Sequence, residues 1–226
     1  MPERPRTKLL AHLAPAPGAE AELAARLVEL ADELAARGPE VASLWRVPRD
    51  PFGTKTPWRG TLELRGSEAE LLAHAAGLAE RFGALVDAAA STALIGSEHV
   101  LLESPPAPVR YQYLMRRRAD FSHAAYLAYY RDVHAKFGLR TPGSLGYVQL
   151  HVDPAASRDA AGTSGFGVCD VDSVSELHLA SLRDFLRAVA GSTIGAEVVA
   201  DEERFVDRMR SFDLCSHVRR HERSPA

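Results

Sequence analysis

One order of predicted elements occurs twice along this chain of 226 residues. Apolar periodicity and turn residues predict, in the first half, strands at 8–13, 41–47, 61–64 and 99–102 and helices at 19–37 and 67–82. The second half repeats the pattern, with strands at 111–116, 145–152, 174–179 and 211–218 and helices at 122–137, 182–189 and 194–205. Each half therefore reads strand, helix, strand, strand, helix, strand, with 194–205 as a further helical piece before the last strand of the second half. The small-residue stretch 154–167 is expected to be a loop, whose glycines could serve a lid.

This order is that of a split β-α-β unit, the ferredoxin-like arrangement. Helices cover one face of such a sheet, so the other face needs a second cover. We therefore expect an α+β fold of two tandem ferredoxin-like units whose sheets face each other as an internal pseudo-dimeric barrel. The expected divisions are a degenerate unit at 1–104, a proline-rich linker at 105–109 and a second unit at 110–226. Two loosely tethered domains are the alternative, but both sheets would then expose an apolar face.

Composition excludes several classes of protein. The formal net charge is −3 and basic residues are scattered, which argues against nucleic-acid binding. No apolar run approaches the roughly 20 residues of a membrane span, and the basic start lacks the apolar stretch of a signal peptide. We therefore expect a cytoplasmic protein, either a monomeric pseudo-dimer or a homodimer, in which Cys169 and Cys215 stay reduced. Phosphate-binding glycine loops and a Gly-x-Ser-x-Gly elbow do not occur.

A set of spaced motifs in the second half resembles the signature of the EthD family. That signature is a strand ending in Arg, a helix with an aromatic pair followed by His, and a strand containing Tyr. The matching segments here are 113–118, 121–122, 126–127, 129–134 and 146–149, with a later Phe-x-Asp at 205–207. The resemblance covers about 111–218, and the first half has no counterpart of the Tyr-Tyr-Arg-Asp-Val-His helix. Any active site is therefore expected once.

The resemblance implies a member of the dimeric α+β barrel superfamily. Relatives there include cofactor-independent cyclases, decarboxylases and oxygenases and, more distantly, haem-dependent enzymes. It therefore implies a cofactor-independent enzyme that acts by acid/base catalysis on a hydrophobic aromatic or polyketide-like molecule, in the cavity between the sheets. Cyclisation, isomerisation and decarboxylation remain open as reactions. The alternatives are a non-catalytic small-molecule binding protein and a haem- or metal-dependent oxygenase.

Helical spacing places Tyr126, Tyr130 and His134 on one face of the predicted helix at 122–137. Such a stripe could hold an aromatic ligand and move a proton, because histidine titrates near neutrality. We expect His134 to be the acid or base, with Tyr113, Tyr126 and Tyr130 binding substrate. The alternative is that the aromatic residues are core and His134 only caps the end of the helix.

Strand alternation supplies the other candidates. If Val148 and Leu150 face the helices, their neighbours face the opposite sheet, and the same reasoning applies to the two later strands. The residues expected in the space between the sheets are Tyr147, Gln149, His151, Glu176, His178, Asp213, Cys215 and His217. His151 and His178 are alternative proton donors, and Tyr147, Gln149, Glu176 and His217 are expected to bind substrate. The histidines and Glu176 could ligate a metal, but no closely spaced His pair anchors a site, so no metal or cofactor is expected.

Overall fold

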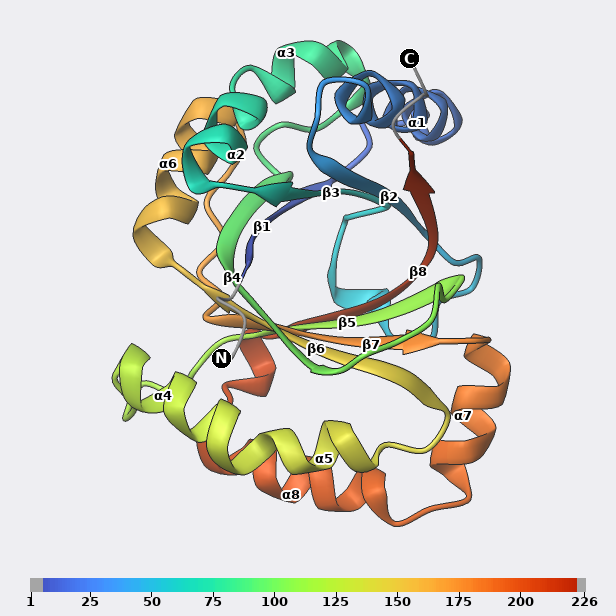
Figure 1. Ribbon diagram of the computed structural model, residues 1–226, viewed down its shortest axis with the longest axis vertical. Coiled ribbons are helices and arrows are strands. Elements are labelled where there is room, and N and C mark those ends of the chain that lie inside the picture. The colour runs from blue at the N-terminus through green and yellow to red at the C-terminus, as the bar shows by residue number, and fades with distance from the viewer. Residues whose placement is uncertain (1–5, 223–226) are drawn as a thin grey trace.

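Antiparallel strands form one closed barrel with helices on its outside (Figure 1). The computed structural model describes residues 6–222, and within them eight strands follow one another around the barrel in the order β1, β3, β2, β8, β5, β7, β6, β4. Every neighbouring pair is antiparallel. The fold is therefore mixed, with helices and antiparallel strands. Within residues 6–222, every helix is too short or too polar to cross a membrane.

The elements of the first half are β1 (Arg6–Leu13), α1 (Glu20–Ala35), β2 (Glu40–Arg46), η1 (Gly53–Lys55), β3 (Gly60–Gly66), α2 (Glu68–Ala75), α3 (Leu78–Phe82), η2 (Gly83–Leu85) and β4 (Thr92–Leu102). The single helix predicted at 67–82 is two helices, because Gly77 at φ 67° turns the chain between α2 and α3. Ser67 and Glu70 form a capping box that starts α2.

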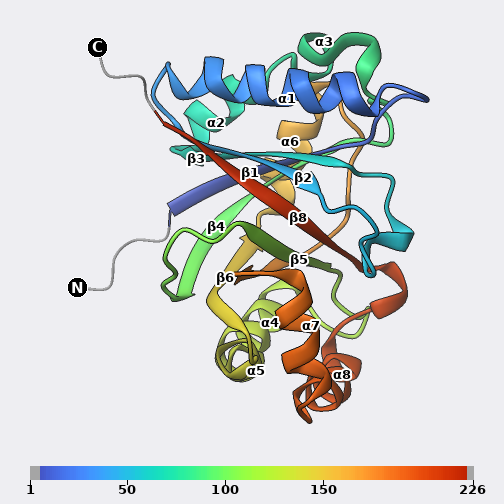
Figure 2. The same cartoon turned by 90° about the vertical axis from the view of Figure 1, so that its right-hand side faces the viewer.

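The elements of the second half are β5 (Val109–Met115), α4 (His123–Tyr129), η3 (Tyr130–His134), α5 (Ala135–Arg140), β6 (Ser144–Val152), α6 (Pro154–Ser164), β7 (Ser173–Leu179), α7 (Leu182–Ala190), α8 (Ile194–Phe205), η4 (Arg208–Arg210) and β8 (Phe212–His221). Here α4, α5, α7 and α8 lie together on one side of the barrel, opposite α1, α2 and α3 (Figures 1 and 2). Cys169 and Cys215 are both free thiols, as expected.

The prediction of a loop at 154–167 was wrong, because residues 154–164 form α6. Asp153 caps the helix through the amides of Ala155 and Ala156, Pro154 occupies its first turn, and Gly165 ends it at φ 77°. The helix packs on β4 and α2, so a segment of the second half covers strands of the first (Figure 2). Its buried face consists of the small side chains of Ala156, Ser157, Ala160, Ala161 and Ser164. Small residues let it lie close to the strand, but they give a weak amphipathic signal.

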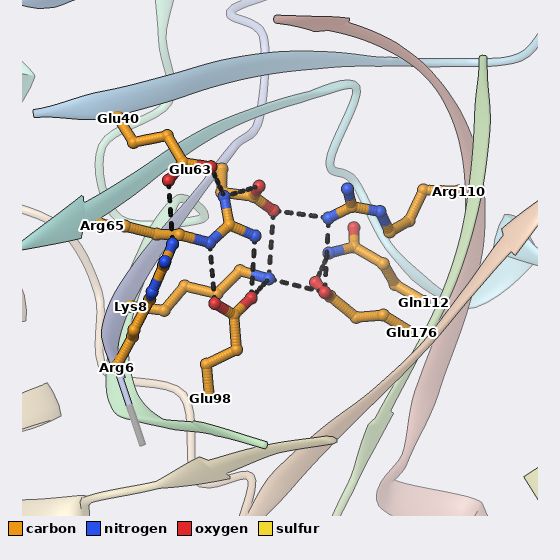
Figure 3. A network of polar contacts seen from close by, with 9 residues as sticks. All are labelled: Arg6, Lys8, Glu40, Glu63, Arg65, Glu98, Arg110, Gln112 and Glu176. Carbon is orange, nitrogen blue, oxygen red and sulfur yellow. Dashed lines mark hydrogen bonds and ion pairs between the residues drawn. The ribbon is translucent and has the colours of Figure 1, made fainter. Parts of the chain in front are cut away.

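The interior of the barrel is packed. One end holds an apolar cluster of Leu10, Ala14, Trp58, Leu94, Leu114, Leu150, Val152, Val171, Val174 and Leu214. The other end holds a buried charged network of Lys8, Glu63, Arg65, Glu98, Arg110, Gln112 and Glu176 (Figure 3). Lys8 Nζ lies 3.2 Å from Glu63, 2.9 Å from Glu98 and 2.6 Å from Glu176. Three cationic and three anionic side chains thus neutralise one another where burial of an unpaired charge would be costly.

Candidate functional site

The candidate site is a cavity of about 330 Å³ outside the barrel, between the second-half strands and the helices that cover them. Its walls come from β5, β6, β7 and β8 on one side and from α5, α7 and α8 on the other. The apolar lining consists of Phe52, Tyr111, Met115, Tyr147, Leu177, Phe185, Leu186, Val189, Ile194, Val198 and Val199. The polar lining consists of Tyr113, His134, Thr141, Ser175, Glu202, Arg208 and Asp213. A mostly apolar pocket with a few converging polar groups is typical of small-molecule sites.

The helix that carries His134 is continuous from α4 to α5 but contains a π-helical segment, η3. Ser122 caps its start by accepting a hydrogen bond from the Ala125 amide. The π-helical turn widens the helix at the Tyr-Arg-Asp-Val-His motif, and such turns often occur at functional sites. Within it, the rings of Tyr130 and His134 lie 5.8 Å apart.

His134 is oriented by a carboxylate. Its Nδ1 lies 2.8 Å from Asp201 Oδ2 on α8, and the hydroxyl of Tyr129 donates to Asp201 Oδ1 at 2.9 Å. Because a carboxylate accepts, Nδ1 carries the hydrogen, and Nε2 keeps its lone pair. Burial lowers the pKa of His134, and the interaction with Asp201 offsets only part of that effect. The imidazole is therefore a neutral, oriented base in the wall of the cavity.

A second group of polar side chains, Tyr113, Glu202, Arg208 and Asp213, lines the cavity on the side of β5 and β8. Burial raises the pKa of Glu202 to about 7, although Arg208 Nε lies 3.3 Å from its Oε2. Burial and the nearby Asp50 raise the pKa of Asp213. Burial also raises the pKa of Tyr113. Glu202 can thus hold or release a proton near neutral pH.

Of the predicted site residues, the cavity brings together Tyr113, His134 and Tyr147. Tyr126 and Tyr130 are fully buried in a neighbouring cluster with Met115, Phe205 and Val206, so the predicted stripe reaches the cavity only at His134. The hydroxyl of Tyr126 lies 2.7 Å from Ser173 Oγ. These two tyrosines support the helix that holds His134.

The predicted orientation of β6 was wrong. Leu150 and Val152 pack inside the barrel, whereas Tyr147, Gln149 and His151 face the helices. Gln149 Nε2 donates to the Tyr130 carbonyl oxygen at 3.1 Å and to the Tyr147 hydroxyl at 2.8 Å. His151 lies beside Gln149 and His99, away from the cavity. Alternation of side chains along β6 could not show which face looks toward the helices, because both faces of this strand are buried.

The predicted orientation of β8 was also wrong. Phe212 and Leu214 belong to the barrel interior, and Asp213, Cys215 and His217 point outward in register with Tyr113, Tyr111 and Val109. His217 is exposed. Leu177 and Leu179 face the helices as predicted, and Glu176 and His178 point into the barrel, but Glu176 is occupied by the charged network. The expected cavity between the sheets is therefore filled, and the pocket lies on the opposite face of the second sheet.

Sequence reasoning missed Asp201, Glu202 and Arg208. A signal for the two carboxylates exists on α8, where the cavity residues Ile194 and Val198 are followed at helical spacing by Asp201 or Glu202 and then Phe205. Two acids on the inward stripe of a helix are unusual, because buried carboxylates need partners. Carboxylates at these positions of the predicted helix 194–205 therefore indicate a functional site.

The donor set can be tested against a metal or a haem. Among the described residues, no group of three or more His, Cys, Asp or Glu side chains is arranged to hold a metal ion. His134, whose Nδ1 is hydrogen-bonded to Asp201, resembles a histidine that could be an axial haem ligand. However, the cavity lies near the lower end of the roughly 300 to 1,000 Å³ found for small-molecule sites, and a tetrapyrrole needs more space. The absence of a cofactor stays a prediction.

Comparison with known proteins agrees with this fold. The family model of the EthD domain matches residues 118–209. An anthrone oxidase-like protein superposes with a TM-score of 0.62 at 12% identity, covering 100% of this chain and 97% of that chain. A proposed monooxygenase from Lactobacillus acidophilus NCFM gives a TM-score of 0.55 at 10% identity, covering 97% of both chains.

A variant of chlorite dismutase from Candidatus Nitrospira defluvii gives a TM-score of 0.55 at 13% identity, covering 95% of this chain and 92% of that chain. A search of curated proteins gives no match. At such identities the structures show the fold alone, which is that of the dimeric α+β barrel proteins. Together with the motifs of the second half, these matches confirm the predicted resemblance: residues 118–209 match the EthD domain, and the fold is similar to that of the dimeric α+β barrel proteins.

Proposed function

We propose that this protein is an enzyme that performs acid/base chemistry on a hydrophobic aromatic or polyketide-like molecule in the cavity under α5, α7 and α8. One observation carries the proposal. His134, whose Nδ1 lies 2.8 Å from Asp201 Oδ2, stands in the wall of a cavity whose other walls are mainly apolar. An oriented imidazole in a water-poor pocket is the arrangement that general base catalysis needs.

The proposed chemistry begins with a proton transfer to His134 Nε2. Asp201 fixes the ring and stabilises the imidazolium that forms, while Tyr129 holds Asp201 in place. Glu202 supplies the second proton-transfer group, since its pKa of about 7 lets it give a proton to the developing product. The apolar and aromatic walls, among them Tyr111, Tyr147 and Phe185, would hold the substrate rings.

Abstraction of a proton from an activated aromatic or polyketide carbon gives an enolate, which can cyclise or isomerise. In a decarboxylation, loss of carbon dioxide from a β-keto acid would give the enolate instead, and Glu202 would protonate it. These reactions are the leading class. Oxygenation is the second candidate, because two proteins with this fold are a proposed monooxygenase and an anthrone oxidase-like protein. There, molecular oxygen would be the oxidant of the same enolate.

We also propose that the chain is an internal pseudo-dimer of two ferredoxin-like units, 1–104 and 110–226, joined by 105–109. Two observations support this. Around the barrel, each half arranges its own strands in the order fourth, first, third, second, and the halves join only at β2 with β8 and β4 with β6. A closed barrel built this way needs no second chain, which supports a monomer.

The test is a turnover assay with a panel of hydroxylated aromatic polyketides of two or three rings, run with and without oxygen. Conversion by wild type and its loss in His134→Asn would support the enzyme. Conversion only with oxygen would select oxygenation. Binding without turnover, with affinity unchanged in His134→Asn, would instead identify a carrier. Neither binding nor turnover across the panel would refute the proposal.

A further inference from the structure

The polar end of the cavity is defined by Tyr113, Glu202, Arg208 and Asp213, and its charges do not balance. Arg208 is the sole cationic residue of the cavity lining within residues 6–222, and its Nε already lies 3.3 Å from Glu202. Asp213 has no hydrogen-bonding or ionic side-chain partner within that described part of the chain. The exposed Lys55 donates to the Arg208 carbonyl oxygen at 3.5 Å and is not part of the lining. The lining therefore holds two carboxyl groups and one guanidinium, which lies beside Glu202.

This imbalance decides which ligands fit. The side chain of Glu202 is 8% exposed, so a ligand that reaches it leaves bulk water behind. A carboxylate or phosphate ligand would meet two acidic groups and a single guanidinium that already lies beside Glu202, so its charge would be poorly compensated in a medium that screens charge poorly. A ligand that presents an O–H donor would give Asp213 the partner that it lacks, or give Glu202 a second partner beside Arg208, and hydrogen bonds to charged groups are the stronger ones.

We propose that the Glu202–Asp213 end of the cavity recognises a free phenolic or enolic hydroxyl, so that the substrate is a neutral hydroxylated aromatic compound and not an aryl carboxylate. This inference rests on the proposed function and narrows its substrate class. Tyr113 and Asp213 are direct neighbours across β5 and β8, and Glu202 faces them from α8. The hydroxyl is thereby held at the strand side of the cavity, with the rings along the apolar wall of Phe185, Val189 and Val198.

The experiment is calorimetric binding at pH 7.5 of four probes with one ring system: 2-naphthol, 2-methoxynaphthalene, 2-naphthoate and the cation 2-naphthylmethylammonium. We expect 2-naphthol to bind about 10- to 100-fold more tightly than the methyl ether, the usual value of a hydrogen bond to a charged group. Naphthoate should bind at least as weakly as the ether.

Variants of the two carboxyl groups test whether they cause the preference for naphthol. Glu202→Gln and Asp213→Asn, singly and together, should reduce the preference for naphthol over the ether to within about threefold if the carboxyl pair is the acceptor, and should relieve the rejection of naphthoate. Glu203→Gln, the exposed neighbour on α8, is the matched control and should keep the wild-type order.

Several results would overturn the inference. Naphthoate binding most tightly, the ammonium probe outranking naphthol, or an unchanged order in the double variant would each do so while leaving the cavity a small-molecule site. If none of the four probes bound, the proposed function would fail together with the inference. If binding followed the expected order but no polyketide were converted, the recognition would stand and only the catalytic proposal would fall.

Discussion

The two halves of the barrel arrange their strands in the same order, but they use the space under their helices differently. In the first half, Leu23, Leu27, Leu30 and Leu34 of α1 are fully buried against β1, β2 and β3, and α6 completes the cover. In the second half, the apolar residues form two separate clusters, one around Tyr147 and Phe185 and one around Tyr126 and Phe205, with the cavity between them.

Side chains, and not the arrangement of the strands, therefore decide whether the space between such a sheet and its helices is a packed core or a cavity. A leucine stripe fills the space above a sheet continuously. Aromatic rings on α4 and η3 and two carboxylates on α8 do not, and they leave His134 and Glu202 at the cavity wall. Gly138 contributes to this shape, because a Cβ there would lie 2.4 Å from the Tyr147 ring.

The largest predicted difference between the two halves is the dependence of turnover on His134. His134→Asn should lower turnover by roughly 10²- to 10⁴-fold, because the amide can still donate to Asp201 but cannot take a proton. Steady-state kinetics on the folded variant measures the effect. The matched control is His74→Asn, a helix histidine of the first half, which should keep full turnover. Equal losses in both variants would remove the distinction between the halves.

Lys8→Met should destabilise the whole barrel by about 3 to 5 kcal/mol, because it leaves three buried glutamates with two arginines. Since Lys8 belongs to the first half and Glu176 to the second, both halves should unfold together. Urea titration followed by far-ultraviolet circular dichroism and by fluorescence of Trp45 and Trp58, both in the first half, checks this. Two separated transitions would contradict it. Arg6→Met, at an exposed ion pair, should cost less than about 1 kcal/mol.

Leu27→Ala and Val198→Ala compare the packed face of α1 in the first half with the face of α8 that lines the cavity in the second half. Leu27 is 1% exposed, and its truncation should cost about 2 to 5 kcal/mol while turnover of the folded protein stays unchanged. Val198 lines the cavity, so its truncation should cost about 1 kcal/mol or less yet alter KM. Thermal unfolding and kinetics on both variants give the answer. A change of KM in Leu27→Ala alone would show that the first half shapes the site.

The last prediction concerns the pH dependence of stability. The pKa of Glu202 is raised to about 7 in the folded protein, above its unfolded value near 4.5. The folded state therefore binds the extra proton, and the stability linked to it is present below pH 4.5 and lost as pH rises through 7. Glu202→Gln should match wild type near pH 5 and exceed its stability by about 1 to 3 kcal/mol at pH 8. Denaturation curves at both pH values measure the difference in free energy of unfolding between the variant and wild type. The same difference at both pH values would mean that folding does not raise the pKa of Glu202.

The sequence allowed prediction of the eight strands, of the EthD resemblance and of the helix that carries His134. It did not allow prediction of which face of β6 or β8 looks outward, because Tyr147, Gln149 and His151 alternate with Val148, Leu150 and Val152, and both sets are buried. A strand buried on both sides carries no amphipathic signal to fix its orientation. The helix α6 was missed for a related reason, since a face of alanine and serine is hardly more apolar than its surroundings.

The pairing of β2 with β8 has a consequence for synthesis of the chain. Ser43 of β2 meets His221 of β8 across 178 residues of sequence, at an Oγ to Nε2 distance of 2.7 Å. At the usual 5 to 20 residues per second of translation, β2 would wait roughly 9 to 36 s for its neighbour, with an unpaired edge open to wrong partners. The barrel therefore closes only when its last strand has left the ribosome, and we expect chaperones to shield the nascent first half until then.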